Sequence, residues 1–316
     1  MASLPEHTGG ELILRVMDFV RDCRAADPRR HYPHVGDIQW WFRDAPLDDE
    51  NNWRFWQDDQ GKVIAIGLAD RLPIGYLLHP LAHRSELEPE FCKWAMERRA
   101  ILDDQAEGKP LPHISEEVFD GDAQRIAWLK ENGYGQGGRV YIRYSRDLNL
   151  PIPEPKLLEG FVIQSVQNEG QVAQRAKLHY EAFEFESVNV PYSLVEEKQR
   201  RSMRMPGYDP QLDLVVVAPD GTWVAECMCW MDEVYREAVF EPVGVLPAFR
   251  RRGLATALLL EGFRRLKARG MEGALLVTGH SSDNVKLELQ DFLYQSVGFR
   301  EIERILKFSK RLATDG

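Results

Sequence analysis

The sequence predicts an α/β protein made of two similar halves. Three observations support this fold class: strand-like and helix-like segments alternate along the second half, a proline-rich stretch lies near the middle of the chain, and segments of the two halves resemble each other at a constant offset. The length of 316 residues fits two domains. With 44% hydrophobic and 28% charged residues, the composition is that of a globular protein with a sizeable core.

The domain boundary is predicted at the proline-rich stretch. Residues 148–155 contain Pro151, Pro153 and Pro155, and such spacing favours an extended linker. We therefore expect one domain over residues 1–150 and a second over residues 156–316.

The elements of the second half follow from their residue patterns. Residues 238–245 are β-branched and aromatic enough to form a strand, although Pro242 cannot donate to a sheet ladder and predicts a bulge or a strand end. Apolar residues then recur at helical spacing, which predicts an amphipathic helix that begins near Leu254. The same reasoning predicts strands at 161–166, 212–218, 223–231 and 273–278, and helices at 171–183, 192–203 and 285–297.

The loop between the strand 238–245 and the helix has the composition of an anion site. The first N–H groups of a helix lack partners within the helix, and the helix dipole adds positive charge there. Gly253 allows a phosphate to approach the backbone, and residues 250–269 hold seven basic side chains and one acidic in a chain of net charge −10. An arginine-rich turn without a ligand is the alternative interpretation.

Two motifs in the second half resemble the GNAT superfamily of acyl-CoA N-acyltransferases. Arg250-x-x-Gly253-x-Ala255 is similar to the family's Q/R-x-x-G-x-G/A signature, and the run from Tyr294 to Phe299 is similar to its Y-x-x-x-G-F ending. The resemblance covers about residues 160–312, and the predicted order β-α-α-β-β-β-α-β-α-β is that of the family. It implies acetyl-CoA as co-substrate and, for the whole chain, two GNAT-like domains, each a mixed, mostly antiparallel sheet flanked by helices.

The resemblance also implies where acetyl-CoA binds. The pantetheine arm follows the exposed edge of the strand that splays before the loop, and a backbone N–H of Val243 or Val245 faces the thioester oxygen, where negative charge develops. Asn284 lies ten residues before Tyr294, whereas many relatives carry an Asn about seven residues before this tyrosine. The candidate cofactor-binding residues are Val243, Gly244, Val245, Arg250, Arg251, Arg252, Gly253, Leu254, Ala255, Thr256 and Asn284.

Glu241 and Tyr294 are the candidate catalytic residues. A carboxylate whose pKa is raised by partial burial can take the proton of an ammonium group, and Glu241 lies on the strand beside the expected thioester. The motif tyrosine, Tyr294, is expected to protonate the departing thiolate. The alternatives are a Glu241 that hydrogen-bonds a neighbouring strand or orders water, and a Tyr294 that only packs in the core. His280 follows the strand 273–278, where it either contacts a ligand or is solvated.

The first half is predicted to be a degenerate copy of the second. At an offset of 165 or 166 residues, His79 to Arg84 lies opposite Val245 to Arg250, and residues 128–134 lie opposite 293–299. In the first copy, however, Leu87 replaces Gly253, and Pro89, which has no N–H, replaces Ala255. Leu129 falls opposite Tyr294. We therefore expect a single acetyl-CoA site in the chain.

Other residues limit the possible partners. Cys227 and Cys229 find no second ligand pair at metal spacing, so we expect small buried side chains and no metal. The aromatic cluster at residues 40–56 is expected to pack a core or the contact between the halves, with a substrate-pocket wall as the alternative. The acidic balance argues against nucleic acid, and the absence of long apolar runs and of a signal-like N-terminus argues against a membrane. We expect a cytoplasmic monomer or homodimer.

The predicted function is an acetyl-CoA-dependent N-acetyltransferase that transfers the acetyl group directly to a small-molecule or peptide primary amine. Two alternatives remain open at this point. One is a CoA-binding regulatory or scaffold protein without turnover. The other is a tandem acetyltransferase similar to mycothiol synthase, with which the chain shares only the superfamily motifs and the layout.

Overall fold

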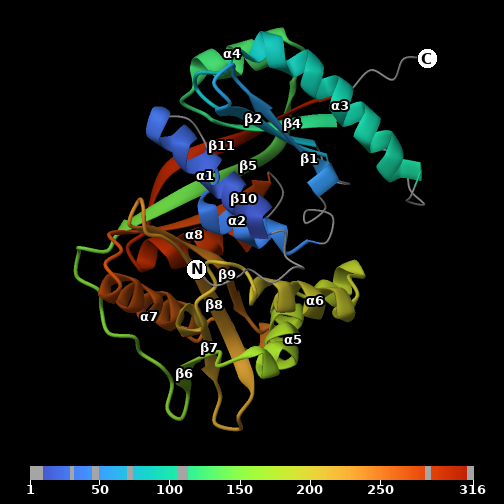
Figure 1. Cartoon of the computed structure of the whole chain (residues 1–316). Coiled ribbons are helices and arrows are strands. Elements are labelled where there is room, and N and C mark those ends of the chain that lie inside the picture. Colours follow the sequence, from blue (N-terminus) through green and yellow to red (C-terminus); the bar gives the residue numbers. More distant parts are fainter. Residues whose placement is uncertain are drawn as a thin grey trace.

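The computed structural model describes residues 10–28, 32–44, 50–69, 74–104, 113–281 and 286–311 (Figure 1). The helices are α1 (Gly10–Ala26), α2 (Val35–Phe42), α3 (Arg84–Asp104), α4 (Ala123–Glu131), α5 (Val172–Ala182), α6 (Tyr192–Ser202), α7 (Leu254–Ala268) and α8 (Lys286–Ser296). The strands are β1 (Trp53–Gln57), β2 (Val63–Leu68), β3 (Ile74–Leu78), β4 (His113–Phe119), β5 (Gly135–Asp147), β6 (Val162–Ser165), β7 (Asp213–Val217), β8 (Trp223–Asp232), β9 (Glu237–Val245), β10 (Gly273–Ser281) and β11 (Arg300–Arg311). Among the described helices, none has the length and apolar character needed to cross a membrane.

The described strands form one continuous sheet in the order β1-β2-β3-β4-β11-β5-β10-β9-β8-β7-β6. Within it the pairs β3–β4 and β9–β10 are parallel and the other pairs antiparallel, which confirms the α/β class with a mixed, mostly antiparallel sheet. The expectation of a separate sheet in each half was wrong. The last strand of each half crosses to the other: β5 pairs with β10, and β11 lies between β4 and β5. A shared sheet leaves two open edges where two sheets would leave four.

Both halves follow the same order of elements. Two helices, three antiparallel strands, a crossover helix, a parallel strand, a helix and a long strand occur in the first half and again after β6 in the second. Residues 151–158, between the halves, have no regular secondary structure. They do not form a free spacer, because Ile152 and Leu157 pack on the core of the second half and Arg264 on α7 donates to Glu154 at 2.5 Å. The domain boundaries remain a prediction.

The helices α1 and α2 join the halves. Their apolar side chains share one buried cluster with Met228, Trp230 and Val239 of β8 and β9. The contact is close at Gly36, where a Cβ atom would overlap Trp230 and Val239. Helix α2 of the first half therefore covers strands of the second, as Figure 1 shows.

Candidate active site

The strand, loop and helix predicted around Gly253 are confirmed as β9, residues 246–253 and α7. Gly253 is the N-cap of α7 with φ of 77°, a left-handed conformation that favours glycine. No side chain caps the helix, and its first backbone bond runs from Ala257 N–H to the Gly253 carbonyl at 3.0 Å. The amides of Leu254, Ala255 and Thr256 therefore precede the helical ladder and are placed to bind an anion.

Two of the three arginines of the loop, Arg250 and Arg252, contact different groups. Arg250 donates to the carbonyl groups of Val245 and Ala182, at 3.1 and 2.9 Å, and forms an ion pair with Glu184. It therefore fastens the loop to the end of α5, a role that the sequence interpretation missed. Arg252 donates back to the Ala248 carbonyl at 3.1 Å.

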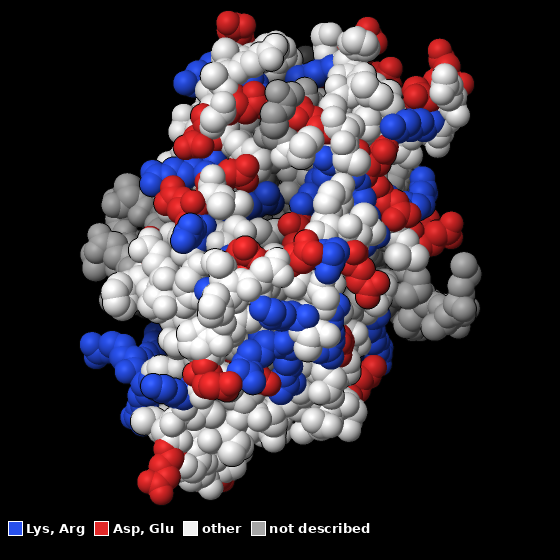
Figure 2. All heavy atoms as spheres, turned by 90° about the vertical axis from the view of Figure 1, so that its left-hand side faces the viewer, with Lys and Arg blue, Asp and Glu red and all other residues white. Residues whose placement is uncertain are grey.

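The basic charge of α7 does not gather at its N-terminus, which corrects the interpretation of the seven basic residues. Figure 2 looks at the side of the molecule on which α7 lies in Figure 1 and shows Lys and Arg side chains mixed with acidic ones over its lower half. Arg264 lies about 15 Å along the helix from Leu254, since each residue advances about 1.5 Å. Arg265 and Arg269 contact Glu261 and Asp209. The anion site therefore depends on backbone amides and the arginines of the loop.

Strands β9 and β10 separate next to the loop. They pair only from Glu237 with Gly273 to Val239 with Leu275, after which β10 continues to pair with β5. The register of β9 against β8 shifts between Phe240 and Val243, so the predicted bulge at Pro242 is confirmed. Beyond Val239, none of the described strands pairs with the side of β9 that faces away from β8, and this side is called the open edge below.

The open edge of β9 presents backbone groups of Val243 and Val245. Leu246 N–H donates to Val224 of β8 at 2.9 Å, and hydrogen-bonding directions alternate along a strand. Val243 and Val245 therefore direct their amides away from β8, toward the separation. Gly244 faces α5, where an added Cβ would lie 2.9 Å from the Phe183 ring and 3.0 Å from Glu226 Oε1. Glycine is needed here because helix and strand approach so closely.

Glu241 lines a cavity of about 350 Å³ between the two halves. One wall is α2 and the residues that follow it, and the opposite wall comes from β5, β10 and β11. Four carboxylates and two guanidinium groups line the cavity, which therefore carries a net negative charge when all six are ionised. They belong to Asp37, Asp44, Glu117, Glu241, Arg43 and Arg143.

The cavity shifts the acidity of its carboxyl groups. The pKa of Glu241 is raised to about 7: burial contributes most to the rise, the negative charge of Asp37 adds to it, and the positive charge of Arg43 opposes both. Burial also raises the pKa of Asp37 to about 6, against the hydrogen bond that its carboxylate accepts from the His34 backbone N–H. Near neutral pH, Glu241 can therefore exchange a proton with a bound group.

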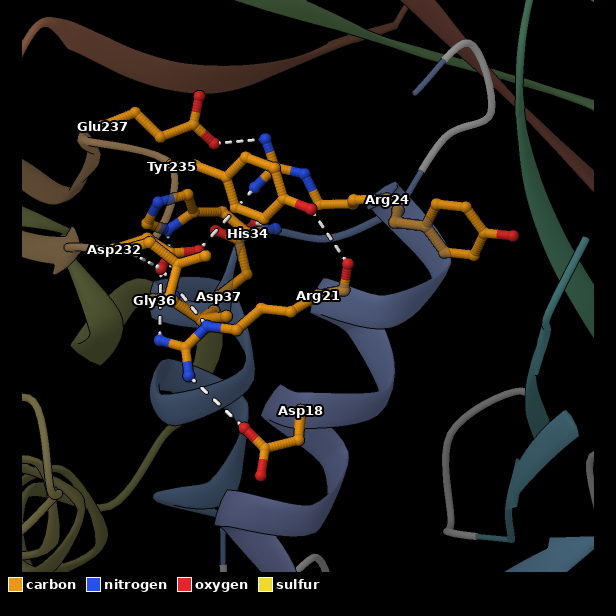
Figure 3. A network of polar contacts seen from close by, with 12 residues as sticks. Asp18, Arg21, Arg24, His34, Gly36, Asp37, Asp232, Tyr235 and Glu237 are labelled. Carbon is orange, nitrogen blue, oxygen red and sulfur yellow. Dashed lines mark hydrogen bonds and ion pairs between the residues drawn. The ribbon is translucent and has the colours of Figure 1, made fainter. Parts of the chain in front are cut away.

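Asp37, which lines the same cavity as Glu241, belongs to a polar network at the start of α2 (Figure 3). Asp37 closes a capping box at the start of α2, in which His34 Nδ1 accepts from the Gly36 N–H at 2.9 Å. From the neighbouring helix α1, Arg21 donates to Asp232 at 3.1 Å and Arg24 pairs with Glu237. These ion pairs fix α1 to the β8–β9 hairpin on which Glu241 lies.

Tyr294 lies on α8, near enough to Glu241 for the charge of that carboxylate to act on its hydroxyl. Its ring is buried against Tyr144 and Phe299, at centroid distances of 6.0 and 6.1 Å. Burial raises the pKa of Tyr294, and the negative charge of Glu241 raises it further. The hydroxyl is therefore protonated at neutral pH and is able to donate, while the ring also packs in the core.

Two predicted residues cannot be placed. Asn284 lies outside the described residues, and only the backbone of His280 is described, in β10. The sequence interpretation missed Asp37 and Arg43, which approach Glu241 from about 200 positions earlier in the chain. The only signal was the nearby aromatic cluster. The core interpretation is confirmed, because Trp40 lies in the core between the halves. Trp40 and Trp41 also line the cavity, and their role as a substrate-pocket wall stays a prediction.

The equivalent region of the first half is built differently. Helix α3 begins at Arg84, the counterpart of Arg250. The residues of the first half that correspond to the candidate anion loop before α7 are therefore helical. Pro89 lies inside this helix. Arg84 donates twice to the buried Glu116, at 2.6 and 2.7 Å, and Arg125 pairs with the same carboxylate. An internal anion thus neutralises the arginine of the first copy.

Comparisons with known proteins agree with this geometry. The model of the acetyltransferase (GNAT) family matches residues 178–299. No curated protein matches the sequence. Among solved structures, a GCN5-related N-acetyltransferase from Sphaerobacter thermophilus is 19% identical with a TM-score of 0.64, and the match covers 99% of this chain and 98% of that one.

Two further structures are similar. A tandem GNAT protein from the clavulanic acid biosynthesis pathway is 16% identical with a TM-score of 0.64, over 97% of this chain and 96% of that one. A glucosamine N-acetyltransferase region of a fungal multi-domain GH3 β-N-acetylglucosaminidase is 18% identical with a TM-score of 0.54, over 94% of this chain and 36% of that one. At these identities the likeness establishes the fold. The C-terminal half of the chain is therefore an acetyltransferase domain of the GNAT family, within a fold shared with tandem GNAT proteins.

Proposed function

We propose that the protein transfers an acetyl group from acetyl-CoA to a primary amine at the junction of its two halves. The observation that supports this most directly is the open edge of β9. It leads from the cavity that holds Glu241 to the uncapped N-terminus of α7. A thioester with a long polar arm and a diphosphate fits this arrangement of cavity, strand edge and helix N-terminus.

Each part of the path fits one part of acetyl-CoA. The amides of Leu254 to Thr256 bind the diphosphate, and a Cβ at Gly253 would meet no atom within 4 Å, so the loop offers room for it. The amides of Val243 and Val245 bind the arm and the thioester oxygen. Acetyl-CoA supplies the acetyl group as a thioester, which an amine converts to an amide with release of the thiol.

Two side chains move the protons. Glu241, whose pKa is about 7, accepts a proton from the acceptor ammonium, because an amine attacks only in its neutral form. Tyr294, protonated at neutral pH, donates to the leaving sulfur. The carboxylates of the cavity favour a cationic acceptor before this proton is lost.

The test is thiol release and product mass across a panel of primary amines, together with calorimetric titration of CoA. We expect CoA binding and an acetylated product with at least one amine. CoA binding without turnover on any amine would instead identify a CoA-binding regulatory protein. Absence of CoA binding would contradict both functions.

A further inference from the structure

A second cavity of about 190 Å³ lies in the first half, next to the proposed active site. It occupies the place where β3 and β4 separate after pairing only through Gly75 and Ser115. This is the counterpart of the separation of β9 and β10 in the second half. Its inner walls are apolar: Val16, Trp53, Ile66, Leu68, Leu77 and Val118.

This cavity is unsuited to CoA. The counterpart of the anion loop is helical, and the buried Glu116 already occupies Arg84 and Arg125. A diphosphate would therefore meet a fixed carboxylate instead of open amides. What remains of the first copy's cleft is an apolar recess whose rim is charged.

The two cavities share a wall. Pro33, Trp41 and Glu117 line both of them, and these residues come from three different segments of the chain. The cavities are therefore separated by at most one layer of side chains. Trp41, one residue of this shared wall, has 42% of its surface exposed.

We infer that the acceptor is an amine with a compact apolar group, which enters the cavity of the first half while its nitrogen lies beside Glu241. The inference rests on the proposed function and specifies its acceptor. The size of the group follows from the volume, because an apolar cavity of about 150 Å³ accommodates benzene. A ring or a short branched chain fits the somewhat larger space here.

The first test measures kcat/KM for straight-chain primary amines from methylamine to octylamine, and for benzylamine. Each methylene that enters an apolar site contributes about 0.8 kcal/mol, or about fourfold in kcat/KM. We expect kcat/KM to rise by about this factor per carbon and then level off once the cavity is filled. A flat series in an enzyme that acetylates methylamine overturns the inference and leaves the proposed function intact. No turnover with any amine contradicts the proposed function, and the inference falls with it.

The second test changes the size of the cavity at Leu77, which lines only the apolar cavity. Leu77→Ala should move the chain length at which kcat/KM levels off to longer amines, a gain that misfolding cannot produce. Leu77→Trp should fill the cavity and lower the ratio of kcat/KM for long amines to kcat/KM for methylamine toward one. Leu81→Ala and Leu81→Trp are matched controls, because Leu81 is 69% exposed and lies outside the cavity. Chain-length profiles that do not change in either Leu77 variant overturn the inference.

Discussion

Replacement of Glu241 by glutamine should abolish most of the activity and at the same time stabilise the protein at alkaline pH. The substitution keeps the size of the side chain and removes its charge. Loss of a positioned general base lowers the rate by about 10² to 10⁴. In the unmodified protein, kcat/KM should rise with pH and reach half its maximum near pH 7, where Glu241 loses its proton. At pH 6 about a tenth of the molecules carry the deprotonated base.

The magnitude of the stability effect follows from the same pKa. Burial raises it from 4.5 in an exposed glutamate to about 7, which corresponds to about 3 kcal/mol. Because the folded-state pKa is raised, the protonated form stabilises the fold below about pH 4.5, and this contribution is lost as the pH rises through 7. Glu241→Gln should therefore increase the free energy of unfolding by at most about 3 kcal/mol at pH 8, and by less than about 1 kcal/mol at pH 5.

The assays are pH profiles of kcat/KM and urea unfolding at pH 5 and pH 8. Two neighbouring variants shift the profile in opposite directions. Asp37→Asn removes a negative charge and should move the rising limb to lower pH, whereas Arg43→Met removes a positive charge and should move it to higher pH. If the Glu241→Gln variant kept both its activity and the rise of kcat/KM near pH 7, Glu241 would not be the base. If it gained no stability at pH 8, the charge would not be desolvated as described.

Three further variants and one control, Gly270→Ala, test other parts of the site. Tyr294→Phe should lower turnover more than CoA affinity, and unchanged turnover with good acceptors would exclude its role as acid. Gly253→Ala and Gly270→Ala both place a Cβ in open space at φ of 77° and 82° at opposite ends of α7, so each should cost about 1 kcal/mol in urea unfolding. Only Gly253→Ala should also weaken CoA binding in calorimetry. Equal CoA affinities of the Gly253→Ala and Gly270→Ala variants would argue against the anion site. Gly244→Ala should lower both stability and CoA affinity, because the added Cβ would lie 2.9 Å from the Phe183 ring. If this variant unfolded like the wild type, the strand would be able to shift and accommodate the Cβ.

Local patterns determined the cofactor part of the site. The bulge at Pro242, the left-handed turn at Gly253 and the start of α7 at Leu254 depend on residues within a short stretch of chain. Backbone conformation and helix periodicity are properties of such stretches, and sequence alone is sufficient to predict them. The loss of the anion loop in the first half likewise followed from Leu87 and Pro89.

Only the tertiary structure decided what surrounds the acceptor. The exchange of β5 and β11 joins the halves into one sheet, and strand pairing over such separations leaves no local periodicity in the sequence. The same folding brings Asp37 and Arg43 to Glu241 and sets its pKa near 7, because desolvation and nearby charge depend on distances in space. The sequence by itself thus determined the strand, loop and helix of the proposed acetyl-CoA site. The contact between the two halves decided the acidity of Glu241, the proposed base, and the shape of the cavity proposed for the amine.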